Sequence, residues 1–253
     1  MRFLAGCGRG RGGGTAVRRG FWLRFAEVIL RPLLLLFTKR TWLGYENVPA
    51  TGPAIFVANH TSLADPLVIA HFLYDRPREM RVLVKSSLFS VPLVGTVLRS
   101  SGQIPVYRKT RNAGEALQTA AARIRAGEAP LIYPEGTVTR DPDLWPMQGK
   151  TGAARLFLDT GAPVIPIVQW GAHALHDYRN GKIRLRPRTP VTVSAGPPVD
   201  LSAYEGAPPS GAVLKEITDV IMRRLRDDLA EVRGEPAPTG PLYDPEAAQG
   251  LAQ

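Results

Sequence analysis

A histidine and a carboxylate five positions apart are the residues of this chain whose types and spacing most directly suggest chemistry. His60 and Asp65 follow the short apolar run 54–58. Five residues turn an α-helix by about 500°, which leaves two such side chains about 140° apart around its axis. They can meet only if His60 stands where a strand ends and Asp65 opens the next helix. The carboxylate would then bond one imidazole nitrogen and leave the other free to take a proton.

The residues around this pair have the pattern that such a geometry needs. Residues 54–58 form an apolar run of strand type, and Asp65-Pro66 is typical of a helix N-cap followed by proline at the first helical position. The spacing alone is weak evidence, because Asp65 could serve only as a helix cap and His60 only as a buried structural histidine. The pair alone is consistent with both interpretations.

Short apolar runs alternate with helical segments along the chain. Strands are predicted at 54–58, 81–84, 103–106, 130–133, 163–168, 182–186 and 191–195. Helices are predicted near 65–74, 86–99, 112–126, 150–160 and 211–233. This alternation predicts an α/β domain with a mostly parallel central sheet flanked by helices.

Two further groups of polar residues follow predicted strands. Glu135, Gly136 and Thr137 come after strand 130–133, and ligand crevices form at the carboxyl ends of strands in open α/β sheets. The strand at 103–106 leads to Arg108, whose planar guanidinium suits a phosphate monoester. Each group also has a plain structural explanation, a proline–glycine turn for the first and a surface arginine for the second.

Four segments taken together, in this order, resemble the four motif blocks of the glycerolipid acyltransferases, most closely the bacterial 1-acylglycerol-3-phosphate acyltransferases. The segments are His-x4-Asp at 60–65, Gly-x-Ile-Pro-Val-x-Arg at 102–108, Pro-Glu-Gly-Thr at 134–137 and Val-Ile-Pro-Ile at 164–167. The likeness runs from about residue 40 to 195. It implies a single acyltransferase domain that moves an acyl group from acyl-CoA or acyl carrier protein to the free hydroxyl of a lysophospholipid, with no other cofactor.

The resemblance also implies roles for particular positions. His60 would be the general base and Asp65 its partner, and Pro166 in the fourth block would help to shape the acyl-donor side. Arg108 would be the phosphate contact of the acceptor site. The other residues expected at the acceptor site are Lys85, Glu135, Gly136, Thr137, Arg140 and Lys150. No metal site is expected, because the remaining histidines lack a matching ligand set.

One position departs from the usual pattern of the family. Members often have arginine after Pro-Glu-Gly-Thr, where this chain has Val138. Either Arg140 takes over the phosphate contact, or the acceptor is a less anionic lysolipid or a glycolipid. A non-catalytic lipid-binding protein with the same fold is the alternative from another class, although lipid binding alone does not need a positioned base.

Positive charge is concentrated at the amino-terminal end. The formal net charge of the chain is +10, and residues 1–40 contribute +8 of it. A nucleic-acid-binding domain would spread its basic residues over a folded face, so nucleic acid is not an expected partner. The basic residues flank an aromatic and leucine-rich stretch, which indicates binding to an anionic membrane surface. The single cysteine excludes an internal disulfide and suits a reducing compartment.

Four segments are predicted along the chain. They are a disordered Gly/Arg-rich tail at 1–20, an amphipathic membrane-interface segment at 21–40, the acyltransferase domain at 41–233 and a flexible Pro-rich tail at 234–253. The second segment is too interrupted to span a bilayer, because its longest apolar run is 33–37 and a span needs about 20 apolar residues. An amphipathic helix packed on the domain is the alternative. The expected location is the cytoplasmic face of the cell membrane, as a peripheral or monotopic protein.

Overall fold

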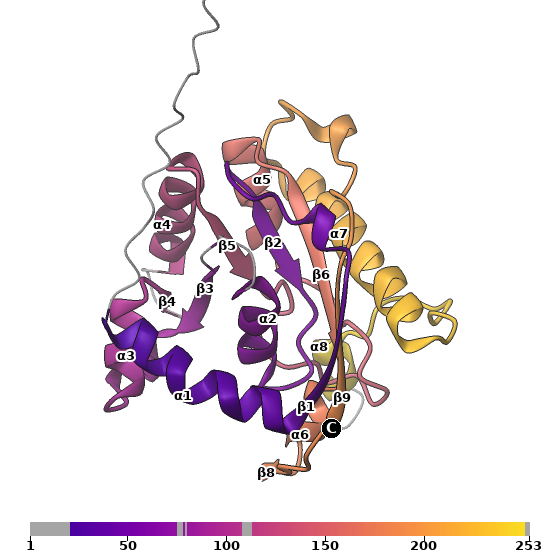
Figure 1. Cartoon of the computed structure of the whole chain (residues 1–253). Helices are drawn as coiled ribbons and strands as arrows, with labels where there is room; N and C mark the ends of the chain where they lie inside the picture. Colours follow the sequence, from indigo (N-terminus) through magenta and orange to yellow (C-terminus); the bar gives the residue numbers. More distant parts are fainter. Residues whose placement is uncertain (1–20, 75–77, 79, 108–112, 251–253) are drawn as a thin grey trace, which may run out of the picture.

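A seven-stranded mixed sheet forms the centre of the protein (Figure 1). The computed structural model describes residues 21–74, 78, 80–107 and 113–250. The strand order is β1-β9-β6-β2-β5-β3-β4. The bounds are β1 Thr38–Leu43, β2 Ile55–Ala58, β3 Met80–Lys85, β4 Ile104–Val106, β5 Ala129–Ile132, β6 Val164–Trp170 and β9 Thr189–Ala195.

The five strands β2 to β6 all run in the same direction. β2 pairs parallel with both β5 and β6, and β3 pairs parallel with both β5 and β4. β9 is antiparallel to β6, and β1 is parallel to β9. The carboxyl ends of β2 to β6 therefore lie along one side of the sheet, here called the carboxyl edge. This topology confirms the predicted mostly parallel sheet.

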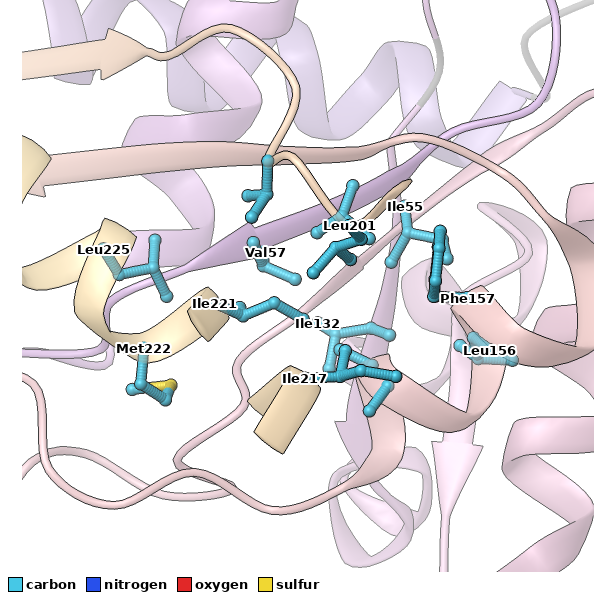
Figure 2. Close-up of a cluster of buried hydrophobic side chains, with 14 of the residues drawn as sticks. Ile55, Val57, Ile132, Leu156, Phe157, Leu201, Ile217, Ile221, Met222 and Leu225 are labelled. Carbon is cyan, nitrogen blue, oxygen red and sulfur yellow. The ribbon is translucent and has the colours of Figure 1, made fainter. Parts of the chain in front are cut away.

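Helices cover both faces of the sheet, because the buried strands alternate their side chains between the two faces. Ile55 and Val57 of β2 belong to one core with α4 (Ala113–Arg125), α5 (Gly152–Thr160) and α7 (Gly211–Arg233). Figure 2 shows this core, with α7 contributing Ile217, Ile221, Met222 and Leu225. Phe56 and Ala58 belong to a second core, which is covered by α2 (Asp65–Tyr74).

The helix α1 (Phe21–Phe37) leads directly into β1 and contacts α2 and α3 (Val94–Ser100). It lies at the same end of the molecule as the carboxyl edge (Figure 1). No helix in the part of the chain that the structure describes is both long and apolar enough to cross a membrane. The remaining elements are η1 (Tyr45–Asn47), η2 (Ser86–Ser90), α6 (Ala172–Leu175), β7 (His176–Asp177), β8 (Lys182–Ile183), η3 (Ser202–Tyr204) and α8 (Pro245–Gly250).

Two of the predicted elements are wrong. The helix predicted near 86–99 is divided into η2 and α3, because Pro92 lacks the N–H and the free φ angle that a continuous helix requires. The strand predicted at 182–186 is reduced to Lys182–Ile183, which pairs with β7 outside the main sheet. Its alternating basic and apolar residues follow a strand pattern, but they are exposed rather than half-buried.

Regular structure is also present where the predicted segments did not include it. β1 was not expected, and it crosses the predicted boundary at residue 40. Only Thr38 of its six residues is buried, so the strand carries no apolar periodicity that a sequence could reveal. Part of the tail predicted to be flexible packs on the domain, since the Gln148 N–H donates to the Tyr243 carbonyl and α8 follows. The tail predicted at 1–20 lies outside the described residues.

Candidate active site

The loops that follow β2 and β5 and the end of β6 meet at the carboxyl edge. These three strands are adjacent in the order β6-β2-β5 and run parallel, so their carboxyl ends are neighbours. His60 follows β2, Tyr133 and Glu135 follow β5, and Gln169 lies near the end of β6. The arrangement places four polar or aromatic side chains from distant parts of the chain around one point.

The predicted contact between His60 and Asp65 is present. The Nδ1 atom of His60 lies 2.9 Å from Oδ2 of Asp65, whose side chain is fully buried while the His60 side chain is 12% exposed. The same oxygen accepts the backbone N–H groups of Thr61 at 2.6 Å and Ser62 at 2.9 Å. Because a carboxylate only accepts, Nδ1 must carry the imidazole proton, and Nε2 keeps a lone pair that can take another.

Asp65 does not cap its helix in the expected way. It opens α2, but its carboxylate turns back over the loop formed by His60, Thr61 and Ser62. In the first turn of the helix, the Asp65 N–H donates to the carbonyl of Ser62, and the N–H groups of Leu67 and Val68 donate to the carbonyl of Ala64. The expected N-cap is therefore wrong, because three donors in the preceding loop hold the carboxylate more favourably than helix N–H groups would.

Glu135 lies directly behind His60. Its Oε1 accepts the His60 N–H at 2.9 Å, and its Oε2 accepts the Met147 N–H at 3.2 Å. The Thr139 N–H donates to the His60 carbonyl at 2.7 Å, so the loop after β5 holds both backbone groups of His60. Glu135 is only 2% exposed. Both its oxygens are already engaged, so the geometry favours positioning of His60 over the acceptor contact that was expected.

Burial raises the pKa of the Glu135 carboxyl group from 4.5 to about 8. The hydrogen bonds from the N–H groups of Met147 and His60 lower this pKa, and the charge of Asp65 raises it slightly. The folded protein therefore binds this proton more tightly than the unfolded chain does. The stabilisation by this group is fully present below about pH 4.5 and is lost as the pH rises towards 8.

Replacing Glu135 by glutamine should consequently alter the pH dependence of stability. The glutamine amide cannot titrate, so the melting temperature of the variant relative to the wild type should rise as the pH increases from about 4.5 to about 8. Thermal unfolding followed by circular dichroism at several pH values in that range measures the difference. A difference that is independent of pH would contradict the raised pKa.

Gly136 and Lys150 are close together next to Glu135. Gly136 has a φ angle of +70°, and a Cβ atom built there would lie 3.2 Å from Cδ and Cε and 3.4 Å from Nζ of Lys150. The Lys150 N–H donates to the carbonyl of Pro134 at 2.8 Å. A side chain at position 136 would thus be strained and would displace the lysine. The structure thus places Lys150 against Gly136, and Thr137 is the next residue of the same loop.

The other predicted site residues are more dispersed. Lys85 is exposed at the carboxyl end of β3, opposite Val106 of β4, and Arg140 is exposed in the loop after β5. Arg108 lies outside the described residues. Pro166 is buried in the middle of β6 opposite Val57, so it lies within the sheet rather than at its carboxyl edge. Its role on the acyl-donor side stays a prediction.

Two buried amide side chains, which the sequence analysis missed, fasten the His60 loop to β6. The Asn59 side chain donates to the Gln169 carbonyl at 3.0 Å and accepts the Gln169 N–H at 2.8 Å. The Gln169 side chain donates to Oγ1 of Thr61 at 2.8 Å. The available signal was a glutamine inside the otherwise apolar strand 164–170, since a buried polar side chain needs a partner.

Tyr133 is a further site residue that the sequence analysis missed. Its ring stacks on the His60 imidazole, with centroids 4.2 Å apart and planes inclined by 24°. Burial and the nearby charge of Asp65 raise the pKa of Tyr133 well above its ordinary value. Its hydroxyl group is buried and has no hydrogen-bond partner among the described residues. Tyr133 therefore limits the movement of the imidazole without a polar contact to it.

A cavity of about 350 Å³ adjoins the His60 loop at Thr61. Val138, which is only 3% exposed, forms part of its wall. The other lining residues are Pro142, Leu144, His173, Ala174, Asp177, Tyr178, Arg179, Asn180 and Arg184. Within the described ranges, no three His, Cys, Asp or Glu side chains converge closely enough to hold a metal ion.

Comparisons with known proteins identify the family of the chain. The model of the acyltransferase family matches residues 39–170. A 1-acyl-sn-glycerol-3-phosphate acyltransferase of Borreliella burgdorferi is 31% identical over 131 residues, which are 51% of this chain and 50% of the relative. The chloroplastic 1-acyl-sn-glycerol-3-phosphate acyltransferase BAT2 of Brassica napus is 29% identical over 61% of this chain and 44% of its own length.

A solved structure shares the fold. The crystal structure of PlsC, the 1-acyl-sn-glycerophosphate acyltransferase of Thermotoga maritima, superposes with a TM-score of 0.61 and 26% identity over 85% of this chain and 81% of that chain. The family model covers His60, Asp65 and the loop after β5, so the chain belongs to the acyltransferase family. The chain spans about half the length of the relatives compared by sequence.

Proposed function

We propose that the protein transfers a fatty acyl group from a thioester, acyl-CoA or acyl carrier protein, to the free hydroxyl of 1-acylglycerol-3-phosphate, which forms phosphatidic acid. The observation that carries the proposal is the His60–Asp65 pair at the carboxyl edge, in which one carboxylate oxygen fixes the imidazole tautomer. A protein that only binds lipid has no need of an imidazole held in this way. The names of the relatives support the same acceptor.

The reaction needs one proton transfer in each direction. Nε2 of His60 removes the hydroxyl proton as the acceptor oxygen attacks the thioester carbonyl. The buried Asp65 carboxylate stabilises the imidazolium that results. When the tetrahedral intermediate collapses, the C–S bond breaks and the imidazolium returns its proton to the departing thiolate. The thiolate is a good leaving group, so no covalent enzyme intermediate is required.

Val138 favours a second candidate acceptor. This position often carries arginine in the family, but here it places a buried apolar side chain in the cavity wall, while Arg140 is exposed to solvent. Val138 removes one phosphate donor from this wall, which favours a lysolipid with a less anionic head group, while Arg179 and Arg184 still line the cavity. The choice depends on whether Arg108, Arg140, Lys85 and Lys150 together supply the positive charge that the phosphate needs.

Thiol release from palmitoyl-CoA tests the proposed reaction. Purified protein is incubated on vesicles with and without 1-acylglycerol-3-phosphate, beside the His60→Ala variant. Release that depends on the acceptor and is lost in the variant supports the reaction. If no release occurs with palmitoyl-CoA, with palmitoyl carrier protein or with any of a panel of lysolipids, the protein binds lipid without transferring acyl groups.

A membrane location at the cytoplasmic face, peripheral or monotopic, is part of this proposal. α1 exposes large apolar side chains, among them Val28 at 72% and Leu36 at 55%. A lysolipid acceptor is amphipathic, and an enzyme in the interface can take it directly from the leaflet. The basic residues in and before α1 complement anionic lipids. The thioester donor would approach from the aqueous side.

Replacing both Val28 and Leu36 by serine is expected to weaken binding to anionic vesicles by about tenfold, because two apolar side chains no longer enter the interface. Co-sedimentation with phosphatidylglycerol vesicles measures the effect. The matched control is Leu43→Ser, since Leu43 is also exposed, at 47%, but lies at the end of β1 that is farther from α1. Equal binding by the double variant and the control would contradict the role of α1.

A further inference from the structure

The segment that follows α6 and the first strand of the small sheet, residues 178–188, is here called the basic hairpin. It contains five Lys or Arg residues and no acidic residue. From Lys182 to Arg188 basic and apolar residues alternate, and all seven are exposed. Ile183 is 69% exposed and Leu185 is 59% exposed. Neither the acyl-transfer chemistry nor the core of the domain requires two adjacent large apolar side chains to face solvent in a strongly basic segment.

The basic hairpin is joined to α1 at one end. The Arg188 N–H donates to the carbonyl of Leu36, in the last turn of α1, at 3.1 Å. Leu36 is itself among the exposed apolar residues of that helix. The hairpin thus continues the surface of α1 rather than forming a separate patch. Both elements lie at the end of the molecule that holds the carboxyl edge (Figure 1).

The basic hairpin also forms one wall of the cavity beside His60. Tyr178, Arg179, Asn180 and Arg184 line this cavity together with Thr61. Arg179 donates to the carbonyls of Asp141 and Pro142, so the hairpin is fixed to the loop after β5. Any surface that receives Ile183 and Leu185 is therefore held next to the cavity.

The large exposed apolar side chains in the described residues share one location. Apart from Leu43, they lie in α1 or in segments that follow the carboxyl ends of β2, β3, β4 and β6. Those outside α1 are Leu63, Leu67, Leu88, Val91, Leu93, Val94, Tyr107, Tyr178, Ile183 and Leu185. A distribution confined to one side of a protein marks an interaction surface. The candidate active site lies on this side.

We propose that the basic hairpin is a second membrane-docking element, which inserts Ile183 and Leu185 into an anionic bilayer and holds the cavity beside His60 at the lipid interface. The inference deepens the proposed function, since it rests on a lipid acceptor. Lys and Arg beside the apolar residues can extend to the phosphate groups while the apolar side chains enter the acyl region. Continuity with α1 and the alternation of basic and apolar residues favour a bilayer over an acidic carrier protein.

A fluorescent label at the hairpin tests its insertion in the full-length chain. In a Cys7→Ser background, Ile183→Cys carries an environment-sensitive dye, and Leu43→Cys with the same dye is the control. Phosphatidylglycerol vesicles should shift the emission to shorter wavelength at position 183 and not at 43, and phosphatidylcholine vesicles should have a smaller effect. No shift with anionic vesicles overturns the proposal. A shift with acyl carrier protein alone assigns the hairpin to the carrier instead.

A double substitution separates this inference from the proposed function. Ile183→Ser with Leu185→Ser should lower the partition coefficient on phosphatidylglycerol vesicles by about tenfold. Turnover of a short-chain lysolipid, supplied as monomers without vesicles, should stay within about twofold of the wild type, because neither residue lines the cavity. Unchanged vesicle binding overturns the docking role even if turnover is normal. Absence of turnover in the wild type refutes the proposed function. The vesicle measurement still tests the docking role in that case, because it does not depend on turnover.

Discussion

Replacing His60 by alanine is expected to lower kcat by about 10²–10⁴-fold, the usual contribution of a positioned general base. The imidazole is the group whose free nitrogen can accept the hydroxyl proton, since its other nitrogen is bonded to Asp65. The fold should survive, because the Asp65 carboxylate keeps the N–H donors of Thr61 and Ser62. Acceptor-dependent thiol release measures the loss, and circular dichroism checks the fold.

Tyr133→Phe is a suitable control for this variant. It keeps the ring that stacks on His60 and removes a buried hydroxyl group that has no partner among the described residues. We expect its turnover to remain within about threefold of the wild type. His60→Ala with wild-type turnover would exclude His60 as the base, whatever the control shows.

Asp65→Asn should produce the second largest loss, also about 10²–10⁴-fold in kcat. The neutral amide no longer stabilises the imidazolium, and its NH2 group cannot replace an oxygen that accepts three donors. The side chain is fully buried, so the variant should also melt at a lower temperature. Kinetics at a temperature well below that melting point separate the chemical effect from unfolding.

The double variant His60→Ala/Asp65→Asn tests whether the two residues act as a unit. If Asp65 acts only through His60, the double variant should be no slower than His60→Ala alone, because there is no imidazolium left to stabilise. Additive losses would show that Asp65 has a separate function, such as holding the loop at Thr61 and Ser62. The comparison uses one assay and needs no assumption about the acceptor.

The pair itself could be predicted because its geometry is local. His60 and Asp65 are five residues apart, and a strand end followed by a helix start is readable from residues 54–66. The positions of Glu135 and Gln169 could not be derived in the same way. Each depends on β2 lying between β5 and β6, and sequence patterns predict strands without giving their order. Motif resemblance identified Glu135 as important but suggested contact with the acceptor rather than with the His60 backbone.

The elements that escaped prediction are those that do not bury an apolar face. β1 is mostly polar, and its pairing with β9 joins residues about 150 positions apart. Residues 182–186 have the alternating pattern of a strand, yet only two of them pair. In both places the sequence pattern shows only which side chains are apolar. Whether a strand forms there depends on the neighbouring strand or helix that packs against it.

β1 also limits where a truncated variant of the protein can begin. It covers β9 along six residue pairs, and its own outer positions carry Lys39 and Arg40, charged residues that discourage pairing with another sheet. A chain that starts within β1 would leave β9 as an uncovered edge whose residues Val191 and Val193 belong to the core. Such an edge is a template for self-association. A truncation intended to remove only α1 should therefore keep every residue from Thr38 onwards, since aggregation of a shorter chain could be mistaken for an effect on the membrane.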